Sequence, residues 1–286
     1  MSRIILGLLI VGTLMGSTVY QDIFFSNWYI DDVTQVERLP SLYTVFAKRI
    51  YGDFYEDYSA DGGIILGKDD NKACGILFDG SPTFGIGRTL NRFRLGLGYS
   101  PKMTGGRHIV AIGFGKDAFR KDFDFAFRYI KPDDGYGIEA DLRFRYRARD
   151  VVFIPHVSYA LRSDGLDYWY INAGIGMRRS IYEEGFIYAA VEYEPWDGDV
   201  DTDHIIFQIG LDLPVTRKLS FLTAVRKTLN YRNDWTASAT ELNPGLRFSY
   251  DELHFIMGLR KDLLAEGLLD AVPIINFSVE YDFSNL

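Results

Sequence analysis

The chain has little of what builds a redox, metal or nucleotide site. Among its 286 residues Cys74 is the only cysteine, and the four histidines are scattered. A single thiol can form neither an internal disulfide nor a cysteine-based zinc site. The glycines lie within alternating segments and not in a loop that could cradle phosphate. The sequence therefore predicts no cofactor and no nucleotide.

Basic charge and long apolar runs are also scarce. The net charge is -8 and the sequence pI is about 5.1, so the electrostatic footprint of a nucleic-acid partner is missing. After Met15 no apolar run reaches the roughly 18 residues that a membrane-spanning helix needs. These two absences weigh against nucleic-acid binding and against a helical membrane protein.

Residues 1–18 are typical of an export signal. Arg3 precedes an apolar stretch from Ile4 to Met15, which is too short to span a bilayer as a helix but matches the apolar region of a secretory signal peptide. The small residues at 16–18 offer a cleavage region, although no Ala-x-Ala motif fixes the bond. We therefore expect residues 1–18 to be removed on export.

Aromatic residues are abundant, and the apolar residues alternate with polar ones. The chain holds 19 Tyr and 21 Phe, and from Arg92 to Phe283 about twelve segments show an apolar residue at every second position. Gly, Asp, Pro or Asn clusters separate these segments. Their length, roughly 9 to 12 residues, suits a tilted β-strand that crosses a membrane. The pattern predicts an all-β, antiparallel chain.

Residues 136–147 show the two faces of such a strand. One face carries the apolar side chains from Tyr136 to Tyr146, and the other carries Glu139, Asp141 and Arg143 with two further arginines. A soluble sandwich could show the same alternation with its charged face in water. The export signal, the strand length and the aromatic residues on the apolar face favour a membrane barrel.

The final segment carries a resemblance. Ile275, Phe277, Val279, Tyr281 and Phe283 alternate up to an aromatic residue near the C-terminus. Residues 60–286 thereby resemble bacterial outer-membrane β-barrels, of a generic porin-like kind. The resemblance implies a transmembrane up-and-down barrel in the outer membrane, with outer-membrane lipids and lipopolysaccharide as neighbours. Long connections at 195–203, 227–241 and 261–272 would then lie outside the cell.

The strand count depends on the region before Arg92. Residues 62–68 and 72–79 look like one more hairpin, which makes 14 strands the preferred count, with 12 or 16 as alternatives. Residues 19–59 form a separate N-terminal segment in this interpretation. Leu42, Val45, Phe46 and Ile50 have helical spacing, so a periplasmic or plugging helix competes with an extra strand there.

Strand parity sets a charged face inside the barrel. A turn centred between Asp133 and Asp134 pairs positions whose numbers sum to 267 and juxtaposes opposite charges. The expected lumen-lining residues are Asp122, Asp124, Arg128, Glu139, Asp141, Arg143, Arg145 and Arg147. They could form a constriction for ions or small solutes, or a salt-bridge network that stiffens the wall.

Two further groups of residues could carry chemistry. His156, Ser158 and Asn172 resemble the His-x-Ser pair and following Asn of outer-membrane phospholipases, although Tyr159 and Ala160 replace the Asn-Gly usual there and parity places the trio in the lumen. Alternatively, the three residues are polar side chains of the lumen that have no catalytic role. The acidic loop with Asp197, Asp199, Asp201 and Asp203 could bind Ca²⁺ or simply be solvated.

The sequence as a whole favours a narrow channel for passive transport of ions or small solutes, or a structural outer-membrane protein. A barrel-embedded lipid hydrolase is the alternative.

Overall fold

The structure of the chain is a computed structural model. It describes residues 24, 28–29, 35–54, 60–69, 71–79, 81–101, 107–118, 120–163, 167–181, 185–198, 202–231, 235–260 and 274–283. The expected signal segment, residues 1–18, lies outside the described residues.

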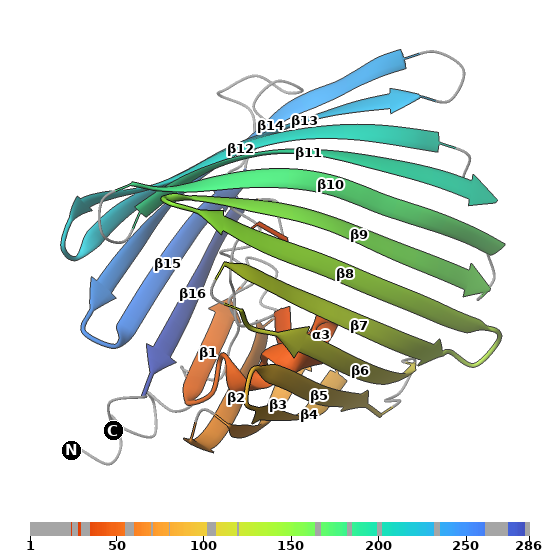
Figure 1. The fold of residues 1–286 in the computed structure, drawn as a ribbon. Helices are drawn as coiled ribbons and strands as arrows, with labels where there is room; N and C mark the ends of the chain where they lie inside the picture. Colours follow the sequence, from red (N-terminus) through yellow and green to blue (C-terminus); the bar gives the residue numbers. More distant parts are fainter. Residues whose placement is uncertain are drawn as a thin grey trace.

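The described strands form one closed antiparallel barrel in which each strand pairs with its neighbours in sequence (Figure 1). The sixteen strands of the described chain are β1 (Arg49–Phe54), β2 (Ala60–Asp69), β3 (Lys72–Asp79), β4 (Ser81–Leu90), β5 (Phe93–Ser100), β6 (His108–Lys116), β7 (Lys121–Lys131), β8 (Tyr136–Ala148), β9 (Val151–Ser163), β10 (Asp167–Ile181), β11 (Gly185–Gly198), β12 (Thr202–Thr216), β13 (Leu219–Tyr231), β14 (Trp235–Tyr250), β15 (Leu253–Arg260) and β16 (Ile274–Asp282). The ring closes where β1 pairs with β16, and Arg49 forms ion pairs there with Glu280 and Asp282.

The preferred count of 14 strands is wrong, because the described chain has 16. The twelve segments after Arg92 are strands β5 to β16, and the predicted hairpin is β2 and β3. The two missed strands are β1 and β4. In β4 the inward positions 85 and 87 are glycines, so the apolar-to-polar contrast of alternation is weak there. The barrel begins at Arg49 and not at residue 60.

Two connections that the sequence interpretation treated as long loops are mostly strand. In the connection predicted at 195–203, strand β11 extends to Gly198 and strand β12 begins at Thr202. In the connection predicted at 227–241, strands β13 and β14 leave only 232–234 between them. Backbone pairing of Trp196 with Thr202 continues the hairpin. Hydrogen-bonded pairing satisfies the backbone of a projecting hairpin even where side chains no longer alternate clearly. In Figure 1 strands β8 to β14 are long, whereas strands β1 to β6 are short.

The two faces of the wall differ in chemistry. Large apolar side chains project outward around the ring, and Ile112, Ile175 and Ile209 each remain more than half exposed. Charged and polar side chains on the opposite face are buried, among them Asp124, Arg143 and Asp212, each at 0% exposure. This is the reverse of a soluble protein, whose apolar side chains lie inside. A barrel of this kind suits a membrane, because its apolar outer band contacts lipid and its polar face encloses the lumen.

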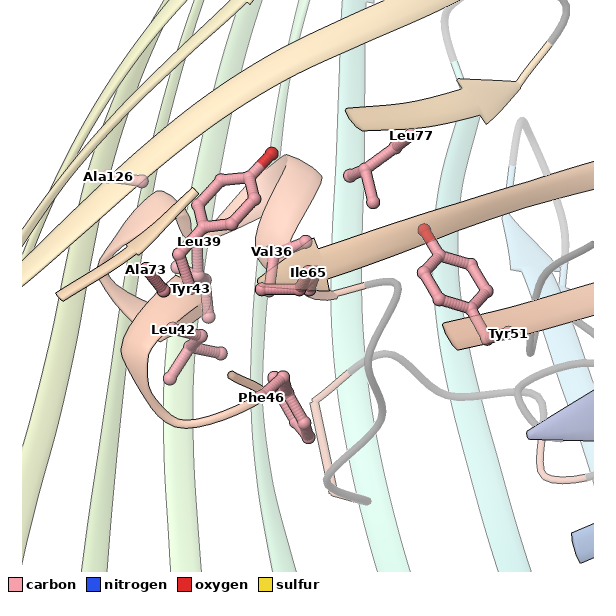
Figure 2. Packing of buried hydrophobic residues seen from close by; sticks show 10 residues of the cluster. All are labelled: Val36, Leu39, Leu42, Tyr43, Phe46, Tyr51, Ile65, Ala73, Leu77 and Ala126. Carbon is pink, nitrogen blue, oxygen red and sulfur yellow. The ribbon is translucent and has the colours of Figure 1, made fainter. Parts of the chain in front are cut away.

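A segment before β1 lies inside the ring. It contains α3 (Gln35–Arg38) and the 3-10 helix η1 (Pro40–Thr44), and η1 contacts strands β3 to β7. Figure 2 shows its apolar side chains packed against inward residues of the wall. The cluster consists of Val36, Leu39, Leu42, Tyr43, Phe46, Tyr51, Ile65, Ala73, Leu77 and Ala126. No helix in the described part of the chain is long and apolar enough to cross a membrane.

The helical spacing from Leu42 to Ile50 predicted the interior segment only in part. The 3-10 helix ends at Thr44, and Ile50 already belongs to β1. Pro40 begins this helix, since its missing N–H costs nothing at a first turn.

Glycines on the inward face let η1 approach the wall. A Cβ added at Gly96 would lie 1.9 Å from the carbonyl oxygen of Pro40, and one at Gly113 would lie 2.5 Å from the backbone nitrogen of Ser41. At Gly85 it would overlap the ring of Tyr43. These glycines therefore form the seat of the interior segment, because any larger side chain would displace it.

Residues near the start of the described chain pack inside another part of the ring. Phe24, Trp28 and Tyr29 pack against inward side chains of β9, β11, β13 and β15, which include Ile154 and Tyr188. The hydroxyl of Tyr188 donates a hydrogen bond to the carbonyl oxygen of Phe24. Interior contacts thus reach both sides of the ring.

Candidate functional site

The candidate site is the charged wall of β7 to β9 together with the interior segment that it faces. The predicted register is confirmed: Asp122 pairs with Arg145, Asp124 with Arg143, Ala126 with Asp141 and Arg128 with Glu139. Their side chains point inward, where seven of the eight predicted lumen-lining residues have side chains at most 20% exposed. Arg147, the eighth, is 57% exposed and reaches Asp122 at 3.4 Å. Whether these residues line a conducting route stays a prediction.

Asp124 is the centre of the first cluster. Its carboxylate accepts hydrogen bonds from Arg94 at 2.8 Å and from Arg143 at 3.0 Å, and Arg145 lies at 3.6 Å. The hydroxyl of Ser41, in η1, donates to the same carboxylate at 3.2 Å. A fully buried carboxylate is tolerable here because several donors replace its hydration.

Arg143 extends this cluster to the interior segment. One terminal nitrogen holds Asp124, and the other donates to the side-chain oxygen of Gln35 at 3.1 Å and to the carbonyl oxygen of Trp28 at 3.4 Å. The wall therefore contacts two separate parts of the interior chain, at Trp28 and at Gln35, through a single guanidinium group.

Asp141 is the centre of a second cluster. Arg38, the last residue of α3, donates to Asp141 at 2.8 Å and to the hydroxyl oxygen of Ser158 at 2.7 Å. Ser158 in turn donates to Asp141 at 2.6 Å. Arg128 lies 3.5 Å from the other carboxylate oxygen and also pairs with Glu139, which binds Arg162 as well. One cation of this network comes from the interior segment.

Aromatic contacts add to the anchoring of α3. The guanidinium of Arg38 lies 4.2 Å from the centre of the Trp28 ring, and that ring stacks on His156 with 4.4 Å between the ring centres. The ring of Tyr29 meets His156 edge-on. His156 therefore serves as a platform for the interior residues.

The predicted trio of His156, Ser158 and Asn172 is brought together, but its bonds are not those of a hydrolase. Ser158 lies opposite Asn172, as the predicted register requires, and Nε2 of His156 is 2.6 Å from Oδ1 of Asn172. The Ser158 hydroxyl, however, donates to Asp141 and not to His156. Nδ1 of His156 is buried and has no partner within the described residues. A nucleophile and base in hydrogen-bond contact are therefore missing from this geometry.

The proposed calcium ligands fall partly outside the described residues. Asp199 and Asp201 are not described, and Asp203 accepts a hydrogen bond from the hydroxyl of Tyr193 at 2.9 Å. Asp197 lies across the hairpin on β11. Within the described ranges no group of three potential ligands could hold a metal ion.

Sequence reasoning missed the partners that the interior segment supplies, namely Gln35, Arg38 and Ser41. A signal was present in the glycines. Three neighbouring strands, β4 to β6, carry glycine at inward positions 85, 87, 96, 98, 113 and 115, where a barrel of this width would ordinarily present polar side chains. Such a patch indicates that another part of the chain packs closely there.

A closed antiparallel ring with an apolar outside and a charged inside defines the class of the molecule: a transmembrane-type β-barrel. Comparison with solved structures agrees with this class. A bacterial polysaccharide outer membrane secretin is similar with a TM-score of 0.59 at 14% identity, over 82% of this chain and 97% of that one. OmpT of Vibrio cholerae is similar with TM-scores of 0.56, for a variant lacking loop L8, and 0.52, each at 12% identity and over 82% of this chain and 96% and 95% of those chains.

The particular family is not defined by these likenesses. No family model and no curated protein sequence matches the chain. The chain thus has the fold of bacterial outer-membrane β-barrels, which its structural neighbours share.

Proposed function

We propose that the chain is an exported, integral outer-membrane protein of a Gram-negative bacterium that forms a narrow passage for ions or small solutes, closed at rest by its own interior segment. The apolar outer surface fits a lipid bilayer, with outer-membrane lipids and lipopolysaccharide as the surrounding partners. Residues 1–18 supply the export signal in this proposal.

The width of the barrel favours a channel role rather than a purely structural role. Small barrels of about eight strands are filled by their own side chains, whereas those of about 16 to 18 strands leave an aqueous lumen. This barrel has 16 described strands, and the lumen is occupied by a separate segment of chain. A barrel whose interior was filled by side chains alone would need fewer strands.

The observation that carries the proposal is the polar contact between segment and wall. Arg38 to Asp141, Gln35 to Arg143 and Ser41 to Asp124 are contacts that water can replace if the segment shifts. The glycine seat beneath η1 also leaves no interlocking side chains at Gly96 and Gly113. Movement of the segment would expose a wall already lined with charge.

Nothing in the geometry favours the lipid hydrolase. Ser158 lies in the lumen, where it is 1% exposed, and its hydroxyl is engaged by Asp141 and Arg38. Lipid acyl chains would meet the opposite, apolar face of β9.

Single-channel recording in planar bilayers tests the proposal. We expect the wild-type protein to show small, infrequent openings and Arg38→Ala to open more often, because the anchor of α3 is lost. Arg179→Ala is the matched control, since it removes an exposed ion pair with Asp150 at a distant turn. Absence of conductance in both the wild type and Arg38→Ala would overturn the passage and leave a structural role.

A further inference from the structure

A cavity of about 220 Å³ lies inside the barrel between the interior segment and the wall of β4 to β7. Its wall includes Ser81, Ser100 and Arg107, which adjoin the β3–β4 and β5–β6 connections. The cavity therefore lies toward the end of the barrel that bears these connections, above η1. At roughly 30 Å³ per water molecule this space corresponds to about seven waters, which suits one small solute.

Donors are concentrated on the wall side of this cavity. On the wall side three hydroxyl residues line it, Ser81, Thr83 and Ser100, and the last two are 2.6 Å apart and bonded to each other. One proton serves that bond, so the second hydroxyl of the pair can donate to an oxygen of a ligand. Hydroxyls in such a position bind oxygen atoms of a polar solute.

Two guanidinium groups add positive charge. Arg128 pairs with Glu139 and Asp141 through a terminal nitrogen, yet its Nε is buried without a hydrogen-bond partner in the described part of the chain. Arg107 lines the same cavity and is exposed. A buried donor without an acceptor costs stability until water or a ligand accepts from it.

The charges around the cavity leave a surplus of one positive charge. Glu37 of α3 lines the cavity and offsets the charge of Arg107. Arg128 shares Glu139 and Asp141 with Arg162 and Arg38, so these three cations exceed the two carboxylates by one. A monoanion matches that surplus of one, and a dianion would be repelled by Glu37. Val36 and Ile109 add apolar surface to the lining, and Tyr43 of η1 adds a hydroxyl that is buried with no hydrogen-bond partner within the described residues.

From these contacts we propose that the cavity is a binding subsite for a small, hydroxylated monocarboxylate, of the size and chemistry of a sugar acid. Its carboxylate lies toward Arg107 and Arg128, and its hydroxyls face Ser81, Thr83 and Ser100. The inference rests on the proposed passage. It names the class of solute that would bind on entering the passage from the end that bears the β3–β4 and β5–β6 connections.

Titration calorimetry on the purified, detergent-solubilised barrel tests the subsite without requiring transport. The probes are gluconate, glucose as the neutral analogue, and inorganic phosphate as the small oxyanion without hydroxylated carbons. We expect gluconate to bind at least five times more tightly than either of the others. Arg107→Gln should weaken gluconate binding at least fivefold, and Arg179→Gln, which removes the same charge at the far end, should leave it unchanged.

Equal binding of gluconate and glucose, tighter binding of phosphate, or an Arg107→Gln variant that binds like wild type would each overturn the subsite, as would absence of gluconate binding. Failure of the passage would register separately, as a lack of conductance in bilayers whatever the calorimetry shows. Assembly of the variants is checked by heat-modifiable migration on gels, and Ser100→Ala, which keeps every charge, provides a second test through weakened gluconate binding.

Discussion

Arg38 and Asp141 are separated by 103 positions in the chain and are joined by a 2.8 Å ion pair inside the barrel. Asp141 is 1% exposed, and Arg38, at 23%, is the partner that comes from the interior segment. This contact connects α3, a helix of four residues, to strand β8 of the wall. Polar bonds of this kind therefore join the interior segment to the wall in addition to its apolar packing.

Loss of that bond should weaken both stability and closure. We expect Arg38→Ala to lower the free energy of unfolding by about 1 to 3 kcal/mol, because Asp141 loses a charged donor while Arg128 remains at 3.5 Å. Urea unfolding in lipid vesicles measures this. The exposed pair of Arg179 and Asp150 provides the control, since its removal should change stability by less than about 1 kcal/mol. Equal losses in the two variants would contradict the anchoring role.

The glycine seat offers a test within one strand face. Gly96→Ala places a methyl group 1.9 Å from the Pro40 carbonyl oxygen and should displace η1. Gly98→Ala is its matched control, because the added Cβ meets Ala111 at 3.5 Å and Pro40 at 3.7 Å, which are ordinary contacts. Both variants should assemble, but only Gly96→Ala should show faster proteolysis of the interior segment and more frequent channel openings. Identical behaviour of the two would mean that the seat is not tight.

The Asp124 cluster predicts a charge-reversal rescue. Asp124→Arg would bring a fourth cation beside Arg94, Arg143 and Arg145 and should severely reduce assembly. Adding Arg143→Asp returns a carboxylate to the position directly opposite in the register, so partial recovery is expected. The yield of heat-modifiable barrel reports the outcome. A double variant no better than the Asp124→Arg single variant would contradict the direct pairing.

Substitutions on the outer surface test which part of the wall lies in the bilayer. Ile175, on β10, is 51% exposed near the middle of its strand, and Ile175→Arg should cost about 2 to 4 kcal/mol if it lies at the midplane. Val215, 59% exposed one residue before the end of β12, should tolerate arginine at a cost of about 0 to 1 kcal/mol. Refolding yields into vesicles compare the two. A larger loss for Val215→Arg would place the membrane elsewhere.

Much of the barrel could be predicted from sequence, because alternating apolar and polar residues indicate which face of a strand meets lipid and which face meets the lumen. The β7–β8 register followed from a short turn centred between Asp133 and Asp134 together with the pairing of opposite charges, and Asp124 does face Arg143. Strand β4 escaped because its inward positions 85 and 87 are glycines that face Tyr43, so the polar partners of alternation are missing there. Strand β1 escaped because it has only six residues, and its Ile50 also fitted the helical spacing from Leu42. The roles of Arg38 and Ser41 were out of reach, because a contact spanning 103 positions leaves no local pattern.

The central claim, that the interior segment must move for the passage to open, is tested most directly by locking it in place. The side-chain oxygens of Thr44 in η1 and Thr89 in β4 are 2.8 Å apart, close enough for a disulfide to replace their hydrogen bond with little movement. Thr44→Cys with Thr89→Cys is made in a Cys74→Ala, Arg38→Ala background, where openings are frequent. Single-channel recording should show openings suppressed under oxidation and restored to the level of the background by a reducing agent. Equal conductance in the oxidised and reduced states would contradict the claim.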